Sequence, residues 1–143
     1  MAFDKILIAS DHAGYQLKKQ IIEKLPKIIF EDLGTENEES VDYTDFANLV
    51  AKRISSNNRL YGILICGTGV GMSVAANKYS NVRAGLAFNS EIAMMIRKHN
   101  DANILVLPGR YMHIDEAKRC IDNFISTSFE GGRHSRRINK IIE

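Results

Sequence analysis

Short runs of apolar residues recur along the chain and are separated by polar or amphipathic stretches. The runs are nearly continuous rather than alternating, which is typical of strands that are covered on both faces. We therefore read them as buried strands. The pattern predicts five strands, at residues 5–10, 27–34, 61–66, 83–88 and 103–108.

The stretches between these runs carry apolar residues at helical spacing. Leu17, Ile21, Ile22 and Leu25 share one face of a helix predicted at residues 15–25, which Pro26 ends. An acidic loop then precedes a second helix. Further helices are predicted around residues 46–54, at 72–80, 90–100 and 114–129, and as a short last helix within 130–143.

The alternation of strands and helices predicts an α/β fold, because parallel strands need helical crossovers that cover both faces of the sheet. We expect a three-layer αβα, Rossmann-like sandwich with a five-stranded parallel sheet and a C-terminal helix. Ligands of such folds lie beyond the carboxyl ends of the strands. That rule selects Asp11 and His12 after the first strand, Cys66 after the third and Arg110 after the fifth.

Length and composition narrow the class of protein. The chain has 143 residues, 45% hydrophobic and 25% charged, so we expect a single domain over residues 1–143. The net charge of +2 argues against nucleic acid as a partner. No stretch approaches the roughly 18 apolar residues that a membrane span needs, and the first apolar run is too short for a signal peptide. Two cysteines indicate no disulfide framework, so we expect a cytoplasmic protein.

The third predicted strand runs into the turn "CGTGVG", which places Cys66 directly before Gly67, Gly69 and Gly71. A dinucleotide fingerprint would need a third glycine where Met72 stands. Three glycines at a helix start can instead turn backbone N–H groups toward one anion. A tight turn without a ligand is the alternative.

Cys66 itself has two interpretations. A thiol near a helix N-terminus has increased thiolate character, and a base beside an oxyanion site suits proton abstraction next to a carbonyl. Cys66 could equally be a small buried hydrophobe at a strand end. Cys120 lies on an apolar helical stripe and is assigned to the core.

Other polar clusters add chemistry to this edge of the sheet. His12 and His99 are candidate acid–base groups, although a lone histidine is more often structural. No histidine spacing suits a metal, so we expect none. Tyr43 could border a pocket. Near the C-terminus, the "GGRHSRR" segment crowds three arginines, which suits either phosphate binding or a solvated basic helix.

Taken together, "SDHAG", "DY", "ICGTGVGMSVAANK", "HND", "GR" and "EGGRHSRR" resemble the ribose-5-phosphate isomerase B family, in order and spacing over nearly the whole chain. The wider family also holds isomerases of galactose and allose 6-phosphates. The resemblance implies interconversion of ribose 5-phosphate and ribulose 5-phosphate through an enediolate, in the non-oxidative pentose phosphate pathway.

The resemblance also implies roles for individual residues. Cys66 would be the base, Thr68 would assist at the enediolate, and His99 would open the furanose ring with help from Asp11. The other implied residues bind substrate, with the phosphate held by His12 and the arginines; they are His12, Tyr43, Gly67, Gly69, Val70, Gly71, Asn100, Arg110, Arg133 and Arg137.

Family members need no metal or organic cofactor, and they form dimers or dimers of dimers. Their sites are shared between subunits, and the resemblance leaves open which subunit supplies His99, Asn100 and Arg110. This sequence departs from the family pattern at Thr44, where proline is frequent, and at the bulky residues that follow Arg110.

Three other functions stay open from the sequence. The chain could act on a six-carbon sugar phosphate, either alone or as half of a heteromer. It could bind a sugar phosphate or nucleotide without catalysis. It could also be a thiol redox protein, which would require Cys66 and Cys120 to meet.

Overall fold

The computed structural model of the protein describes residues 5–142, and its five strands form one parallel sheet. The order across the sheet is β2-β1-β3-β5-β4, so the chain starts near the middle, moves to one edge and then fills the other side. The strands are β1 (Ile6–Ser10), β2 (Phe30–Asp32), β3 (Tyr61–Cys66), β4 (Ala84–Leu86) and β5 (Ile104–Pro108).

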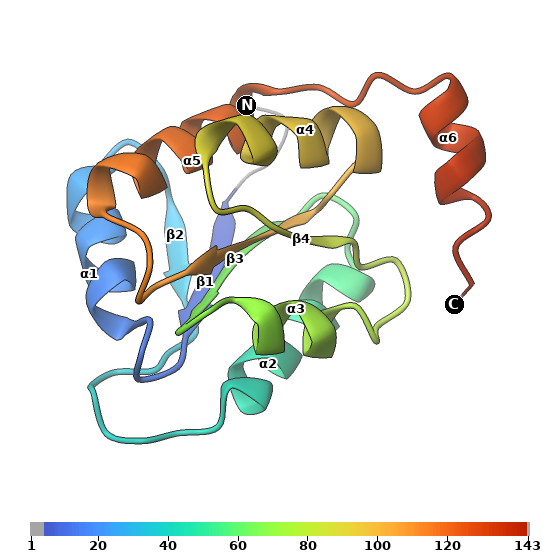
Figure 1. Ribbon diagram of the computed structural model, residues 1–143. Helices are drawn as coiled ribbons and strands as arrows, with labels where there is room; N and C mark the ends of the chain where they lie inside the picture. Colours follow the sequence, from blue (N-terminus) through green and yellow to red (C-terminus); the bar gives the residue numbers. More distant parts are fainter. Residues whose placement is uncertain (1–4, 143) are drawn as a thin grey trace.

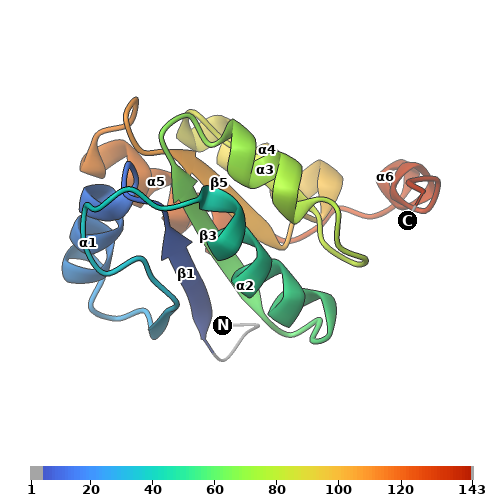
Figure 2. The ribbon, with the colours of Figure 1, turned by 90° about the horizontal axis from the view of Figure 1, so that it is seen from below.

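Helices cover both faces of the sheet, which confirms the three-layer arrangement (Figures 1 and 2). One face is covered by α1 (Tyr15–Lys24), α4 (Ser90–Asn100) and α5 (Ile114–Ser126). The other is covered by α2 (Tyr43–Ser55) and α3 (Val70–Ala76). The chain ends with α6 (Arg133–Ile138).

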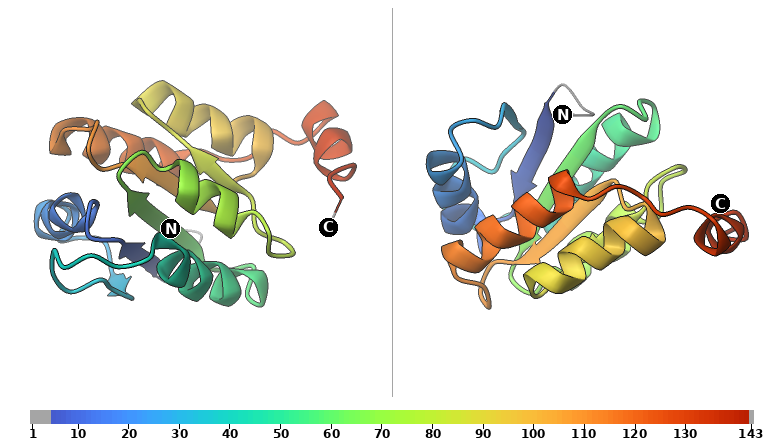
Figure 3. Two further views of the ribbon diagram at one scale, coloured as in Figure 1. Left: turned by 60° about the horizontal axis from the view of Figure 1, so that its bottom comes forward. Right: turned by 90° about the horizontal axis from the view of Figure 1, so that it is seen from above.

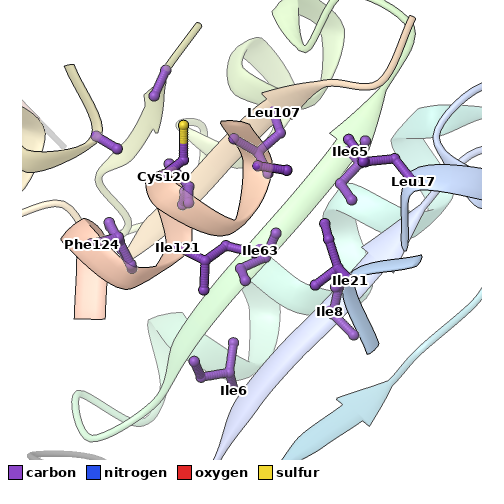
Figure 4. Packing of buried hydrophobic residues seen from close by; sticks show 14 of the residues in the cluster. Ile6, Ile8, Leu17, Ile21, Ile63, Ile65, Leu107, Cys120, Ile121 and Phe124 are labelled. Carbon is purple, nitrogen blue, oxygen red and sulfur yellow. The ribbon is translucent and has the colours of Figure 1, made fainter. Parts of the chain in front are cut away.

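Alternating residues of each strand divide the core between the two faces, because successive side chains of a strand point in opposite directions. Ile6 and Ile8 of β1 pack toward α1 and α5, as Figure 4 shows, whereas Leu7 and Ala9 pack toward α2. This alternation places Cys66, the last residue of β3, on the face covered by α2 and α3. Cys120 lies on α5 and therefore on the other face. The sheet therefore separates the two thiols, which argues against the redox alternative.

The two edge strands are shorter than predicted. β2 is Phe30–Asp32 rather than residues 27–34, and β4 is Ala84–Leu86 rather than 83–88. Each pairs with only one neighbour, so its ladder extends only as far as that neighbour supports it. In addition, a turn after α1 takes up residues 26–28.

Two helix boundaries also differ from the prediction. α3 begins at Val70 rather than Met72, because Gly69 adopts a left-handed conformation (φ 79°) and starts the helix directly. It ends at Ala76, and turns follow it. α5 ends at Ser126, three residues before the predicted end, and an extended segment follows it.

That extended segment leads into α6, which stands clear of the sandwich at the opposite end from α1 (Figures 1 and 3). We call residues 127–142 the C-terminal arm. The arm lies against the end of α4, where the Glu130 N–H donates to the Lys98 carbonyl at 3.1 Å. Arg97 fixes its beginning through the Thr127 carbonyl.

Within residues 5–142, no helix has the length and apolar character that crossing a membrane would require.

Candidate active site

Three strand ends meet at the carboxyl edge of the sheet, and backbone hydrogen bonds join them. The Asp11 N–H donates to the Ile65 carbonyl at 3.1 Å. The Gly109 N–H donates to the Cys66 carbonyl at 2.8 Å, and the Arg110 N–H donates to the Gly67 carbonyl at 3.0 Å. The strand-end rule therefore brings together the residues it selected. We call this cluster, with the turn 67–71 and Tyr43, the glycine-turn edge.

Arg110 lies over the start of the glycine turn in its own chain. A Cβ atom placed on Gly67 would lie 3.3 Å from the Arg110 guanidinium, so a side chain there would press against Arg110. The resemblance left open which chain supplies Arg110. Arg110 belongs to the same chain and the same edge as Cys66, because the end of β5 lies beside the end of β3.

The glycine turn leaves backbone donors at the start of α3. The Thr68 hydroxyl accepts the Val70 N–H at 3.2 Å, and the Gly69 carbonyl accepts the N–H of Ser73 at 3.1 Å. The first N–H groups of a helix have no partner within the helix. Those of Gly71 and Met72 thus remain to bind an anion. Thr68 acts as a cap, and its hydroxyl hydrogen is still able to donate.

Tyr43 covers this turn from the first residue of α2. A Cβ atom on Gly71 would lie 2.6 Å from the Tyr43 ring, so only glycine allows the ring to lie there. The Tyr43 side chain is 39% exposed, which leaves it accessible beside the turn. This placement fits the prediction that Tyr43 borders a binding site.

Asp11 and His12 extend the edge toward α1. The buried Asp11 carboxylate accepts the Gly14 N–H at 3.0 Å and so holds the turn after β1. The His12 Nδ1 accepts the Val41 N–H at 3.2 Å. Because Nδ1 is an acceptor, the proton of neutral His12 lies on Nε2, which is then a donor for a ligand.

Cys66 is buried, with 4% of its surface exposed, and it packs among the side chains of the α2 and α3 face. Cys66 is thus the last residue of this apolar layer before the glycine turn begins. Burial fits both interpretations of this residue. The adjacent turn, with its free donors and Arg110, distinguishes Cys66 from Cys120. Cys120 lies on α5 and is buried in the core on the other face of the sheet.

The sequence analysis missed a buried lysine that supports this edge. Lys18 is 1% exposed, and its Nζ lies 2.6 Å from both the Asp32 carboxylate and the Thr35 carbonyl. It thereby ties the loop after β2 to α1, and that loop carries the Val41 N–H that contacts His12. Lys18 stands among the lysines and glutamines of α1, so only its contacts identify it.

His99 and Asn100 lie at the opposite edge of the sheet. They end α4, and the residues that follow join the beginnings of β4 and β5, where the Asn103 N–H donates to the Arg83 carbonyl at 3.0 Å. The strands between the two edges have up to six residues, at about 3.3 Å per residue. One chain therefore does not bring His99 to Cys66.

The two predicted phosphate-binding arginines of the arm belong with His99. Arg133 and Arg137 are exposed one turn apart on α6, whose packing is against α4. The prediction of one phosphate clasp that joins them to His12 and Arg110 is not met within a single chain. We call His99 and Asn100, together with α6, the His99 region.

His99, Glu130 and His134 form a cluster whose potential ligand atoms lie within 4.8 Å of one another. The two imidazoles stack, with ring centroids 4.3 Å apart and planes 16° apart. A metal lies in the plane of each imidazole that binds it, along the nitrogen lone pair. Rings stacked in this way do not point at one ion, so the arrangement does not suit a zinc centre.

Known proteins resemble this chain over nearly its whole length. The sequence model of the family described as Ribose/Galactose Isomerase matches residues 6–141. Ribose-5-phosphate isomerase B of Escherichia coli is 39% identical over 139 residues, covering 96% of this chain and 93% of the relative.

Solved structures extend the likeness to the fold. A ribose 5-phosphate isomerase of Thermotoga maritima matches with a TM-score of 0.92 at 52% identity, covering 95% of each chain. Ribose-5-phosphate isomerase B of Mycoplasma genitalium, solved with bound ribulose-5-phosphate, matches with a TM-score of 0.91 at 46% identity. That match covers 96% of this chain and 93% of the other.

Proposed function

Because the chain belongs to the ribose/galactose isomerase family, we propose that it interconverts ribose 5-phosphate and ribulose 5-phosphate. The observation that carries the proposal is the meeting of Cys66, the glycine turn and Arg110 at one edge of the sheet. A thiol base, an oxyanion site and a cation are what aldose–ketose isomerisation of a phosphate ester requires.

The proton transfers follow from this arrangement. His99 donates a proton to the ring oxygen as the furanose opens, while Asp11 on the opposite side accepts the proton of the O1 hydroxyl as the C1 carbonyl forms. The Cys66 thiolate removes the proton on C2 of the open aldose, and negative charge develops on O1. The backbone N–H groups of the glycine turn, with Thr68, stabilise that enediolate. The oxygen-bound proton moves from O2 to O1, and the Cys66 thiol returns its proton to C1 to give the ketose.

Phosphate binding uses His12 and Arg110 from one chain with Arg133 and Arg137 from another. We therefore propose a site shared by two copies of the chain, in a homodimer or a dimer of dimers. The separation of the glycine-turn edge from the His99 region supports this assignment, since each holds only part of the required chemistry. No metal or organic cofactor takes part in the proposed steps.

Two measurements with purified protein test the roles of Cys66 and His99 separately. Conversion of ribose 5-phosphate requires both ring opening and proton transfer. Exchange of the C1 proton of ribulose 5-phosphate with deuterated water requires only proton transfer, because phosphorylation of its C5 oxygen keeps this ketose open.

Replacing the proposed base should stop both reactions. We expect Cys66→Ala to lower conversion and exchange by about 10²- to 10⁴-fold, the usual contribution of an acid–base group. Cys120→Ala is the matched control, since it removes the other buried thiol on the far face of the sheet and should retain both. His99→Asn should lower conversion but retain exchange. Full activity of Cys66→Ala, or a wild-type protein without turnover, would contradict the proposal.

A six-carbon sugar phosphate is the second candidate, because the matching family includes galactose isomerases. Turnover of allose 6-phosphate and galactose 6-phosphate should be compared with that of ribose 5-phosphate under the same conditions. A higher kcat/KM for either hexose phosphate would move the assignment to that substrate.

A further inference from the structure

His134 has no role in the proposed chemistry, yet it is the buried residue of an otherwise accessible helix. It is 5% exposed, whereas Arg133, Arg136 and Arg137 beside it on α6 are exposed. A ring buried on a projecting arm must pack against something specific. Its partner is the ring of His99, which it meets nearly parallel at 4.3 Å.

The backbone of the arm sets this contact. The Glu130 N–H donates to the Lys98 carbonyl at 3.1 Å, which joins the arm to the last turn of α4 one residue before His99. Gly131 and Gly132 then adopt positive φ angles of 70° and 57°, which a side chain would disfavour. The chain thus reverses into α6 with His134 facing back onto His99.

Burial and neighbouring positive charges lower the pKa of His134, which favours its neutral form. Burial is the largest cause that lowers its pKa, followed by the charges of His99 and Arg133. Arg137 acts in the same direction, and Glu130 opposes it, with its carboxylate 3.5 Å from Nε2. A neutral aromatic face opposite His99 is the result.

A ring in this place holds the imidazole of His99 in one orientation through stacking contact. His99 is the penultimate residue of α4.

We propose that His134 is a positioning residue for His99, a flat ring that orients the imidazole for ring opening. The assignment to ring opening rests on the proposed isomerase function. The stacking itself is independent of the substrate. His134 acts through His99 and contacts no reacting atom.

Three variants separate the aromatic face from the imidazole nitrogens. His134→Ala removes the ring, His134→Gln keeps a polar side chain of similar size without an aromatic face, and His134→Phe keeps a flat ring without nitrogens. His113→Ala is the control, since His113 is an exposed histidine at the start of α5, away from the pair.

The first readout is the NMR chemical shift of the His99 ring protons without substrate. We expect His134→Ala and His134→Gln to lose the ring-current shift that the stacked ring produces on His99. His134→Phe and His113→Ala should stay close to wild type. Two non-aromatic variants keep the test valid if one of them does not fold.

The second readout is the pair of reactions described for Cys66. Conversion of ribose 5-phosphate should fall by roughly 10- to 100-fold in the non-aromatic variants, which is the scale of a misplaced catalytic group. Exchange at C1 of ribulose 5-phosphate should stay unchanged, and His134→Phe should recover most of the conversion.

Unchanged chemical shifts of the His99 ring protons in folded His134→Ala, or a His134→Phe variant as impaired as His134→Ala, would overturn the positioning role. A wild-type protein that converts no ribose 5-phosphate would overturn the isomerase function instead. In that case the NMR chemical shifts still decide whether His134 orients His99.

Discussion

The glycine-turn edge and the His99 region are built in different ways. At the glycine-turn edge, strand ends and turns are joined by backbone hydrogen bonds, so the sheet itself places Asp11, Cys66 and Arg110. In the His99 region, side chains project from the end of α4 and from an arm that stands clear of the sandwich (Figure 3). The groups of the first are fixed by the backbone of the sheet, and those of the second are side chains fixed by one helix end and the arm.

Each region also depends on its own buried cation. Lys18 ties the loop that reaches His12, through Asp32 and the Thr35 carbonyl. Arg97 is 5% exposed and binds Asp101 at 2.9 Å and the Ala102 carbonyl at 2.6 Å, while its guanidinium lies over the Tyr61 ring. A second copy of the chain is the simplest way to combine two regions that are stabilised separately.

Mixing inactive variants gives the largest expected effect. Cys66→Ala and His99→Asn are each expected to lose conversion of ribose 5-phosphate. If they are unfolded and refolded together, half of the dimers pair one of each. Every such dimer has one intact site of two, so activity should return to about one quarter of wild type.

A matched mixture controls for this recovery. Cys66→Ala mixed with Asp11→Asn should remain inactive, because both residues belong to the same edge and every site then lacks one of them. Recovery in this control, or none in the first mixture when mixed dimers are present, would contradict the shared site.

Replacing the two buried cations should affect the two regions separately. Lys18→Met and Arg97→Met each leave buried oxygen acceptors unpaired, so the free energy of unfolding should fall by about 1–3 kcal/mol. Lys18→Met should speed alkylation of Cys66, and Arg97→Met should speed proteolysis within residues 127–132. Each variant serves as the control for the other. Equal changes in both readouts for both variants would show that the regions are not independent.

The pH dependence of stability provides the smallest effect. Burial raises the pKa of the Cys120 thiol to about 12. Above the ordinary thiol pKa the unfolded chain releases this proton and the folded chain keeps it, so stability falls as pH rises from about 9 toward 12, by at most about 1.4 kcal/mol per pH unit.

Urea unfolding of wild type and Cys120→Ala at pH 7 and pH 10 measures that slope. The difference in unfolding free energy between the two pH values should be smaller in Cys120→Ala. The ratio of ribose 5-phosphate conversion between the two proteins should not change with pH, because Cys120 lies outside both regions. Equal slopes in the two proteins would contradict the raised pKa of the Cys120 thiol.

The apolar pattern was sufficient for the order of elements and for the layers, because near-continuous runs between amphipathic helices have few packing solutions. It was not sufficient for strand length at the edges. β2 and β4 are shorter than their apolar runs, since an edge strand has a neighbour on one side only. The start of α3 depended on the backbone conformation of Gly69, which the residue type permits but does not require.

The site residues also divide into those that the sequence predicted and those that it missed. Asp11, His12, Cys66 and Arg110 followed from the strand-end rule, with the glycine turn beside them. The resemblance left open which chain supplies Arg110, and the structure places it at the edge that holds Cys66. Lys18 and His134 were missed, because their importance lies in burial and in contacts with residues far along the chain.

The sequence by itself determined the fold class, the residues that follow each strand and the types of chemical group available, because these depend on local pattern and residue identity. The tertiary structure decided which of these groups share an edge, since the sheet order β2-β1-β3-β5-β4 sets which strand ends are neighbours. It also placed His99 and the arm away from Cys66. That separation results from the course of α4, which returns from the carboxyl end of β4 to the beginning of β5, and from the contacts that hold the arm against the end of α4.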